Sequence, residues 1–84
     1  MKLHFTQKGW EDYLEWQQHD RAGLKRLNQL IRDVQRDPYA GIGQPEALKH
    51  DLTGYWSRRI DRENRLVYAV EPGLLTIVRC RGHY

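Results

Sequence analysis

The pattern of apolar and polar positions divides the first half of the chain into one strand and two helices. Residues 2–5 alternate polar and apolar side chains, which is typical of a short strand. Residues 7–18 place Trp10 and Tyr13 on one helical face, where we expect them to join the core, with Trp16 to the side. The clearest helical repeat follows and is formed by Leu24, Leu27, Leu30, Ile31 and Val34.

The limits of the two helices are marked by residues that commonly cap or stop a helix. Thr6 and Asp20 each precede a helical stretch and can cap its first turn through a side-chain oxygen. Asp37 precedes Pro38, and a residue before proline is disfavoured in the helical conformation. The second helix is therefore expected to end near Arg36.

The second half of the chain is predicted to be a long loop followed by three strands. Residues 38–54 are rich in glycine and proline, and we expect one helical turn there, around 46–51. Residues 55–60, 65–70 and 74–79 are strand-like and are separated by tight turns. The 84 residues are thus expected to form a single α+β domain of order β-α-α-β-β-β. Two helices would cover one face of an antiparallel sheet and leave the other face open.

Charge is unevenly distributed, although the chain as a whole is only mildly basic. Its formal net charge is +3 and its pI is about 9.2. Residues 1–20 have a net charge of −2, whereas residues 47–84 have a net charge of +3. A basic half on a small domain suits a polyanion or an acidic protein partner, but on charge alone an ordinary solvated surface is the slightly better explanation.

The single cysteine points to a reducing compartment. Cys80 cannot form a disulfide within the chain, and its apolar strand context predicts that it is buried. The sequence has no signal-peptide pattern and no apolar run of membrane-spanning length, so the cytoplasm is the expected location. No set of residues has metal-ligand spacing, and no cofactor is expected.

Arginines interrupt the apolar strands of the second half. Arg58 and Arg59 are consecutive and must point to opposite faces of the sheet, so one of them is expected on the open face. If Arg65 shares that face, two guanidinium groups can bind a phosphate through paired hydrogen bonds. The sequence leaves open which arginine joins Arg65, and whether these side chains are simply solvated.

The other candidates for chemistry lie in the long loop and at the end of the chain. Glu46 is a carboxylate close in sequence to Lys49 and His50 and could serve as a general base. His83 could donate a proton and Tyr84 could stack on a base if the last residues fold back onto the sheet. A base, cations and an acid are what metal-free RNA cleavage requires. A frayed terminus is the alternative.

Several motifs resemble the YoeB toxins of the RelE/ParE superfamily, and together they cover essentially the whole chain. The most specific are Pro-Glu-Ala-Leu-Lys-His at 45–50, Trp-Ser-Arg-Arg-Ile at 56–60 and the terminal His-Tyr at 83–84. Arg-Leu-Val-Tyr-Ala-Val at 65–70 and Cys-Arg-Gly at 80–82 also match, as do Met-Lys-Leu at 1–3, Trp10, Asp-Tyr-Leu at 12–14 and Trp-Gln at 16–17.

This resemblance implies a microbial-ribonuclease-like fold and the toxin half of a type II toxin–antitoxin pair, held inactive by a YefM-like antitoxin. Such a toxin cuts mRNA in the ribosomal A site by 2′-hydroxyl attack, which leaves a 2′,3′-cyclic phosphate or 3′-phosphate and a 5′-hydroxyl. A homodimer, and operator DNA bound only through the antitoxin, are further expectations.

The resemblance also assigns roles to individual residues. Glu46 would be the base, Arg65 the phosphate stabiliser, His83 the acid and Tyr84 an orienting or stacking residue. Lys49 and Arg59 fit as further electrostatic or RNA-contact positions. With His50 and Arg58, which the reasoning from the residues adds, they make up the predicted RNA or phosphate contacts.

Two other functions are compatible with the sequence. A ParE-like toxin would use the same fold to bind and poison DNA gyrase without nuclease chemistry, but it would not need the set Glu46, Arg65, His83 and Tyr84. A protein that only represses DNA with its antitoxin would suit the basic half, but no recognition-helix signature supports it.

Overall fold

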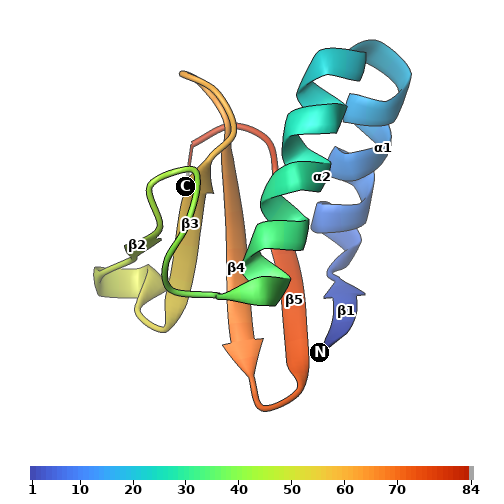
Figure 1. Ribbon diagram of the computed structural model, residues 1–84. Coiled ribbons are helices and arrows are strands. Elements are labelled where there is room, and N and C mark those ends of the chain that lie inside the picture. The colour runs from blue at the N-terminus through green and yellow to red at the C-terminus, as the bar shows by residue number, and fades with distance from the viewer. Residues whose placement is uncertain (84) are drawn as a thin grey trace.

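Within residues 1–83, which the computed structural model describes, two helices pack on one face of a five-stranded sheet (Figure 1). No helix in that range is both long and apolar enough to cross a membrane. In chain order the elements are β1 (Lys2–Phe5), α1 (Gln7–His19), α2 (Arg21–Arg36), β2 (Glu46–Ala47), a 3₁₀ turn (His50–Leu52), β3 (Tyr55–Arg59), β4 (Arg65–Glu71) and β5 (Leu74–Arg79).

The α+β class and the two-helix layer are confirmed, but the sheet is mixed rather than wholly antiparallel. The strand order is β1-β5-β4-β3-β2, and β1 runs parallel to β5 while the other neighbours are antiparallel. The periodicity of residues 2–5 predicted a strand correctly. It could not predict the partner, because pairing with residues 74–77 depends on contacts between opposite ends of the chain.

Both helices begin at the predicted caps. The Thr6 hydroxyl accepts a hydrogen bond from the Gly9 amide at 3.0 Å, and the Asp20 carboxylate accepts one from the Gly23 amide at 2.8 Å. Each bond satisfies an amide that has no partner within the first helical turn. α2 ends at Arg36, directly before Asp37 and Pro38, as predicted.

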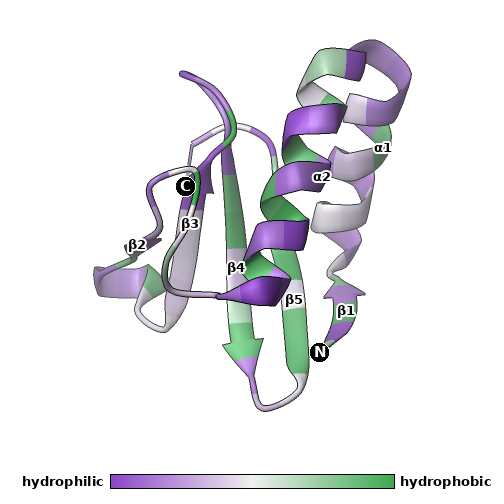
Figure 2. Cartoon of the chain, viewed as in Figure 1, coloured by the Kyte–Doolittle hydropathy of each residue, from purple (hydrophilic) through white to green (hydrophobic). Residues whose placement is uncertain are grey.

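The main core lies between the helices and the sheet. Figure 2 shows the apolar side of α2 turned toward β4 and β5, and its hydrophilic side turned outward. The predicted repeat of α2 is confirmed, since its last four members are fully or almost fully buried. The buried residues of this cluster include Leu27, Leu30, Ile31, Val34, Leu66, Tyr68, Leu75 and Ile77.

α1 packs only partly through the face that its aromatic spacing predicted, because Tyr13 is half-buried against the core but Trp10 is exposed. Trp10 is 46% exposed, whereas Trp16 is 5% exposed and its Nε1 donates to the Cys80 carbonyl at 2.7 Å. Gly9 explains the choice of face, because a Cβ atom there would lie 2.4 Å from the Ile77 carbonyl oxygen. The missing side chain lets α1 approach β5 closely, and the face containing Gly9 and Trp16 is therefore the one that is buried.

Cys80 is buried in this core, as predicted. Burial, and next the nearby Asp12 carboxylate, raise the pKa of its thiol to about 12. The buried Asp12 carboxylate is itself satisfied, because it accepts hydrogen bonds from Lys8 at 2.7 Å and from the Cys80 amide at 3.0 Å.

Candidate active site on the sheet

The sheet face that turns away from the helices gathers the predicted base and two predicted cations. Glu46 pairs with Ser57 across β2 and β3, and Arg59 pairs with Arg65 across β3 and β4. Directly paired residues project to the same face of a sheet, and so do residues two apart on one strand. Glu46, Arg59 and Arg65 therefore share this face, which we call the site face. Arg59, rather than Arg58, is the arginine that joins Arg65.

The floor of the site face is buried, so the face is less open than the sequence predicted. Ser57 and Val67, which pair with each other at its centre, are each 1% exposed. Leu48 is 7% exposed, and its amide donates to the Tyr55 carbonyl at 2.9 Å. A buried floor raises the strength of electrostatic interactions above it, because it excludes water from one side of the charges.

A groove beside β3 brings the predicted loop residues together. Its volume is about 530 Å³, and it is lined by Glu46, Ala47, Leu48, Lys49, His50 and Leu52. The helical turn predicted around 46–51 is wrong for its first part, because Glu46 and Ala47 form strand β2, and a 3₁₀ turn begins only at His50. Pairing with β3 overrides the local preference, and it places the Glu46 carboxylate on the sheet rather than on a separate helix.

The end of the chain folds back onto the start of β4, and Figure 1 shows the segment after β5 crossing over the start of β4 toward β3. The Arg65 amide donates to the Gly82 carbonyl at 2.9 Å, and the Gly82 amide donates to the Asn64 side chain at 2.7 Å. Gly82 has a φ of +76°, a conformation that other residues rarely adopt. His83 is exposed and follows directly after this anchored residue.

The alternative of a frayed terminus is therefore wrong for the residues up to Gly82, which is held in place by hydrogen bonds. His83 follows directly after this anchored residue, beside Arg65. Asn64, which sequence reasoning missed, is itself oriented by Asp61, whose carboxylate accepts from the Asn64 amide at 2.8 Å and from its side chain at 3.0 Å. Tyr84 lies outside the described residues.

Comparison with known proteins identifies the family. A family model described as the YoeB-like toxin of bacterial type II toxin–antitoxin system matches residues 5–84. This chain belongs to that family. A toxin YoeB from Streptomyces coelicolor is 55% identical over 84 residues, which are 100% of both chains.

Solved structures of YoeB proteins have the same fold. The YoeB/ParE toxin from Agrobacterium tumefaciens has a TM-score of 0.96 at 48% identity, over 100% of both chains. A heterotetrameric YoeB–YefM complex from Staphylococcus aureus matches with a TM-score of 0.91 and a YoeB dimer from the same organism with 0.92. Both are 42% identical to this chain and cover 100% of it and 98% of their own chains.

In this YoeB-like toxin Arg58 is a structural residue, and the structure removes it from the predicted phosphate-binding set. It is fully buried on the helix side of β3, where no RNA can reach it. Its guanidinium donates to the Asp33 carboxylate at 2.6 Å and to the Tyr68 hydroxyl at 3.2 Å. It also donates to three backbone carbonyls of the loop after α2, those of Asp37, Ala40 and Ile42.

Arg58, Asp33 and Tyr68 together fasten the loop that leads from α2 to Glu46, and we call them the loop clamp. The Tyr68 hydroxyl donates to the Pro38 carbonyl at 2.7 Å, and Asp33 accepts from the Ile42 amide at 2.9 Å. The hydrogen bonds from Arg36, from the Ile42 amide and from Arg58 lower the pKa of the Asp33 carboxyl from 3.8 to about 2. Sequence reasoning missed Asp33 and Tyr68 because their partners are distant in sequence.

Arg79 adds a third arginine to the site face, and it was also missed. It pairs with Val67, so the row across the sheet reads Glu46, Ser57, Val67, Arg79. Simple alternation along β5 would place Arg79 with Ile77 on the helix side. A register shift between Val67 and Tyr68 reverses this, because an extra residue in one strand moves the following side chain to the other face.

Proposed function

We propose that this chain, as a single toxin domain over residues 1–84, is an endoribonuclease that cuts mRNA on the translating ribosome without a protein-bound metal. The observation that supports it most is the meeting of Glu46, Arg59 and Arg65 on one face, beside the anchored end of the chain. These are the base, the cations and the position of the acid that cleavage through the ribose 2′-hydroxyl needs.

Each residue then has one step in the reaction. Glu46 takes the proton of the 2′-hydroxyl, whose oxygen forms a bond to phosphorus. Arg65 and Arg59 stabilise the charge on the pentavalent phosphorane through charge-assisted hydrogen bonds. His83 gives a proton to the 5′-oxygen as its bond to phosphorus breaks. The products are a 2′,3′-cyclic phosphate, which can hydrolyse to a 3′-phosphate, and a 5′-hydroxyl.

The remaining predicted residues bind rather than react. Lys49 and His50 line the groove next to Glu46 and contact the RNA backbone. Tyr84 stacks on or orients a base next to the cleaved bond, a role that follows from the resemblance alone. No cofactor is needed, because guanidinium and imidazole groups supply the charge stabilisation and the proton transfer.

The proposed partners follow from the relatives. A YefM-like antitoxin holds the toxin inactive, as the YoeB–YefM complex of Staphylococcus aureus suggests by its composition. Operator DNA is bound only through the antitoxin, and the toxin can form a homodimer like the Staphylococcus aureus YoeB dimer. The cytoplasm, where translating ribosomes are found, is the proposed location.

The test is to add the purified chain to translating ribosomes and to map the 5′ ends of the mRNA. New 5′-hydroxyl ends within codons at the A site are expected for the wild type, and few or none for Glu46→Gln. Intact mRNA together with inhibited DNA gyrase would instead indicate a ParE-like toxin. For the metal claim, trace transition metals are stripped while magnesium is held constant, and loss of cutting that zinc or manganese restores would contradict it.

A further inference from the structure

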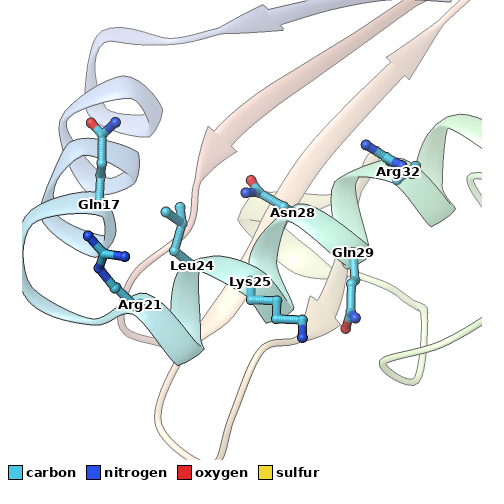
Figure 3. Close-up of a pocket in the computed structure, with 7 residues that line it drawn as sticks. All are labelled: Gln17, Arg21, Leu24, Lys25, Asn28, Gln29 and Arg32. Atoms are coloured by element: carbon cyan, nitrogen blue, oxygen red, sulfur yellow. The ribbon is translucent and has the colours of Figure 1, made fainter.

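A groove between α1 and α2 is lined by cations and amides (Figure 3). Its volume is about 570 Å³, and its cations are Arg21, Lys25 and Arg32. The amides Gln17, Asn28 and Gln29 lie among them. α2 buries its opposite side against the sheet, so this groove faces away from the site face.

The three cations form one line along the helix, which we call the α2 basic stripe. At about 100° per residue, Arg21, Lys25 and Arg32 fall within about 40° of one another around the axis and span about 16 Å along it. All three are exposed. Within residues 1–83 their side chains make no ion pair and no side-chain hydrogen bond with the rest of the chain.

This arrangement works against the stability of α2. Arg21 lies in the first turn, where the helix dipole favours a negative charge, and the carboxylate at this helix start, that of the N-cap Asp20, is used to cap the Gly23 amide. Arg21 and Lys25 are like charges four residues apart, which destabilises a helix. The one carboxylate of α2, Asp33, is engaged by Arg36 and Arg58 and does not face the stripe. The positive charge of the stripe is therefore not compensated by the carboxylate within α2.

We propose that the α2 basic stripe binds the phosphate backbone of structured RNA, as a second RNA-binding surface opposite the site face. This rests on the proposed function, in which the substrate mRNA lies on the ribosome and the toxin is surrounded by ribosomal RNA. The site face holds the strand that is cut, and the stripe holds a neighbouring RNA segment. Binding through phosphates is independent of base sequence.

The composition of the groove favours RNA over an acidic peptide. Leu24 is its single apolar lining residue, and it is half-buried. Peptides that dock on helices need apolar anchors that enter pockets, whereas protein–nucleic acid interfaces are more polar and more positively charged. Amides such as those of Asn28 and Gln29 are also frequent donors to phosphate and sugar oxygens. A more apolar groove, lined by Leu3, Phe5, Trp10 and Tyr13 among others, adjoins this one and shares Asn28 and Arg32 with it.

The experiment measures binding of the full chain to ribosomes that carry no mRNA, as a function of salt. Lys25→Gln/Arg32→Gln is compared with the control Lys2→Gln/Arg62→Gln, which removes the same charge from exposed positions away from the groove. The stripe variant should bind on the order of tenfold more weakly at about 0.1 M salt, with a slope of log K against log salt shallower by about 1.5. The control should match the wild type, and both variants should keep its melting temperature.

Each other outcome has a definite meaning. Equal affinities and slopes for all three proteins, equal weakening of both variants, or no ribosome binding by the wild type would overturn the inference. So would a stripe variant that binds ribosomes normally but loses its antitoxin, since the stripe would then be a peptide surface. If the wild type fails to cut mRNA but still binds vacant ribosomes through the stripe, the proposed reaction fails and the stripe stands.

Discussion

At the scale of single residues, two neighbouring arginines of β3 differ in burial because the side chains of consecutive strand residues point to opposite faces of the sheet. Arg58 points into the core and is fully satisfied by the loop clamp, whereas Arg59 is exposed beside Arg65 on the site face. The same residue type is therefore buried in a hydrogen-bond network on one side of β3 and exposed as a surface charge on the other. The sequence predicted the split, but the register of the hairpin decided which arginine went where.

Arg65 is the residue whose replacement should separate chemistry from folding. Arg65→Ala is expected to reduce cleavage of ribosome-bound mRNA by roughly 10²–10³, the cost of losing one group that stabilises transition-state charge. Its melting temperature should change little, because the anchoring bond to Gly82 uses the Arg65 backbone amide. The control is Arg62→Ala in the turn between the same strands, which should cut normally. Near-wild-type cleavage by Arg65→Ala would remove this side chain from the site.

At the scale of elements, the loop clamp fixes the segment between α2 and β2 and so positions Glu46, the proposed base. Removing the buried Arg58 guanidinium, as in Arg58→Ala, leaves several polar partners unsatisfied and is expected to cost about 3–5 kcal/mol of unfolding free energy. The clamp works through a charged carboxylate, because the Asp33 pKa is lowered to about 2 by its hydrogen-bond donors. Stability should therefore depend on pH in a predictable direction.

The chain should lose stability as pH falls from about 4 toward 2. A carboxyl whose pKa is lower in the folded state than in the unfolded state stabilises the fold above the unfolded value, near 3.8, and this contribution disappears as pH falls through the folded value. Asp33→Asn should be less stable at neutral pH and should lose less on acidification. Denaturant unfolding across pH 2–7 measures both. Parallel curves for the two proteins would contradict this role of Asp33.

The elements predicted from the sequence were those set by local signals, and the differences arose where distant contacts decide. Helix caps at Thr6 and Asp20 and the stop before Pro38 act within a few residues, so the sequence specified the helix limits. Strand β2 exists only through its pairing with β3, and the face of Arg79 depends on a register shift between β4 and β5. Neither the existence of β2 nor the face of Arg79 is indicated by a pattern of neighbouring residues in the sequence.

The residues of the candidate site also divide into those that the sequence predicted and those that depend on distant contacts. The resemblance supplied Glu46, Arg65 and His83, and the register confirmed that the first two share a face. Physical reasoning from the sequence could not place the tail, because the anchor at Gly82 comes from Asn64 and Arg65 on another strand. The sequence also led to Arg58 being predicted as a phosphate-binding residue. An arginine in an apolar strand has the same sequence pattern whether its side chain is exposed or buried in a hydrogen-bond network.

At the scale of the whole molecule, positive charge is presented on two opposite sides. The site face carries Arg59, Arg65 and Arg79, and the far side of α2 carries the basic stripe. An inhibitor that blocks catalysis needs to cover only the first of these. We therefore expect the antitoxin to place an acidic segment over the site face.

Charge reversal should locate the antitoxin. Arg59→Glu is expected to weaken antitoxin binding and to make its salt dependence shallower, because one attractive charge pair becomes repulsive. Lys25→Glu on the α2 basic stripe is the matched control and should leave both unchanged. The measurement is the dissociation constant at several salt concentrations. Unchanged affinity and slope for Arg59→Glu would show that the antitoxin binds elsewhere.

The most direct test of the whole account is the cleavage rate of ribosome-bound mRNA when the last two side chains are removed. His83→Ala/Tyr84→Ala keeps the chain length, so no new terminal carboxylate is created beside Arg65. The variant should melt and bind antitoxin like the wild type, because Gly82 still anchors the tail. Its single-turnover rate should fall by about 10²–10⁴, the usual contribution of a general acid. Cleavage at the wild-type rate would contradict the central claim that this end of the chain completes the active site.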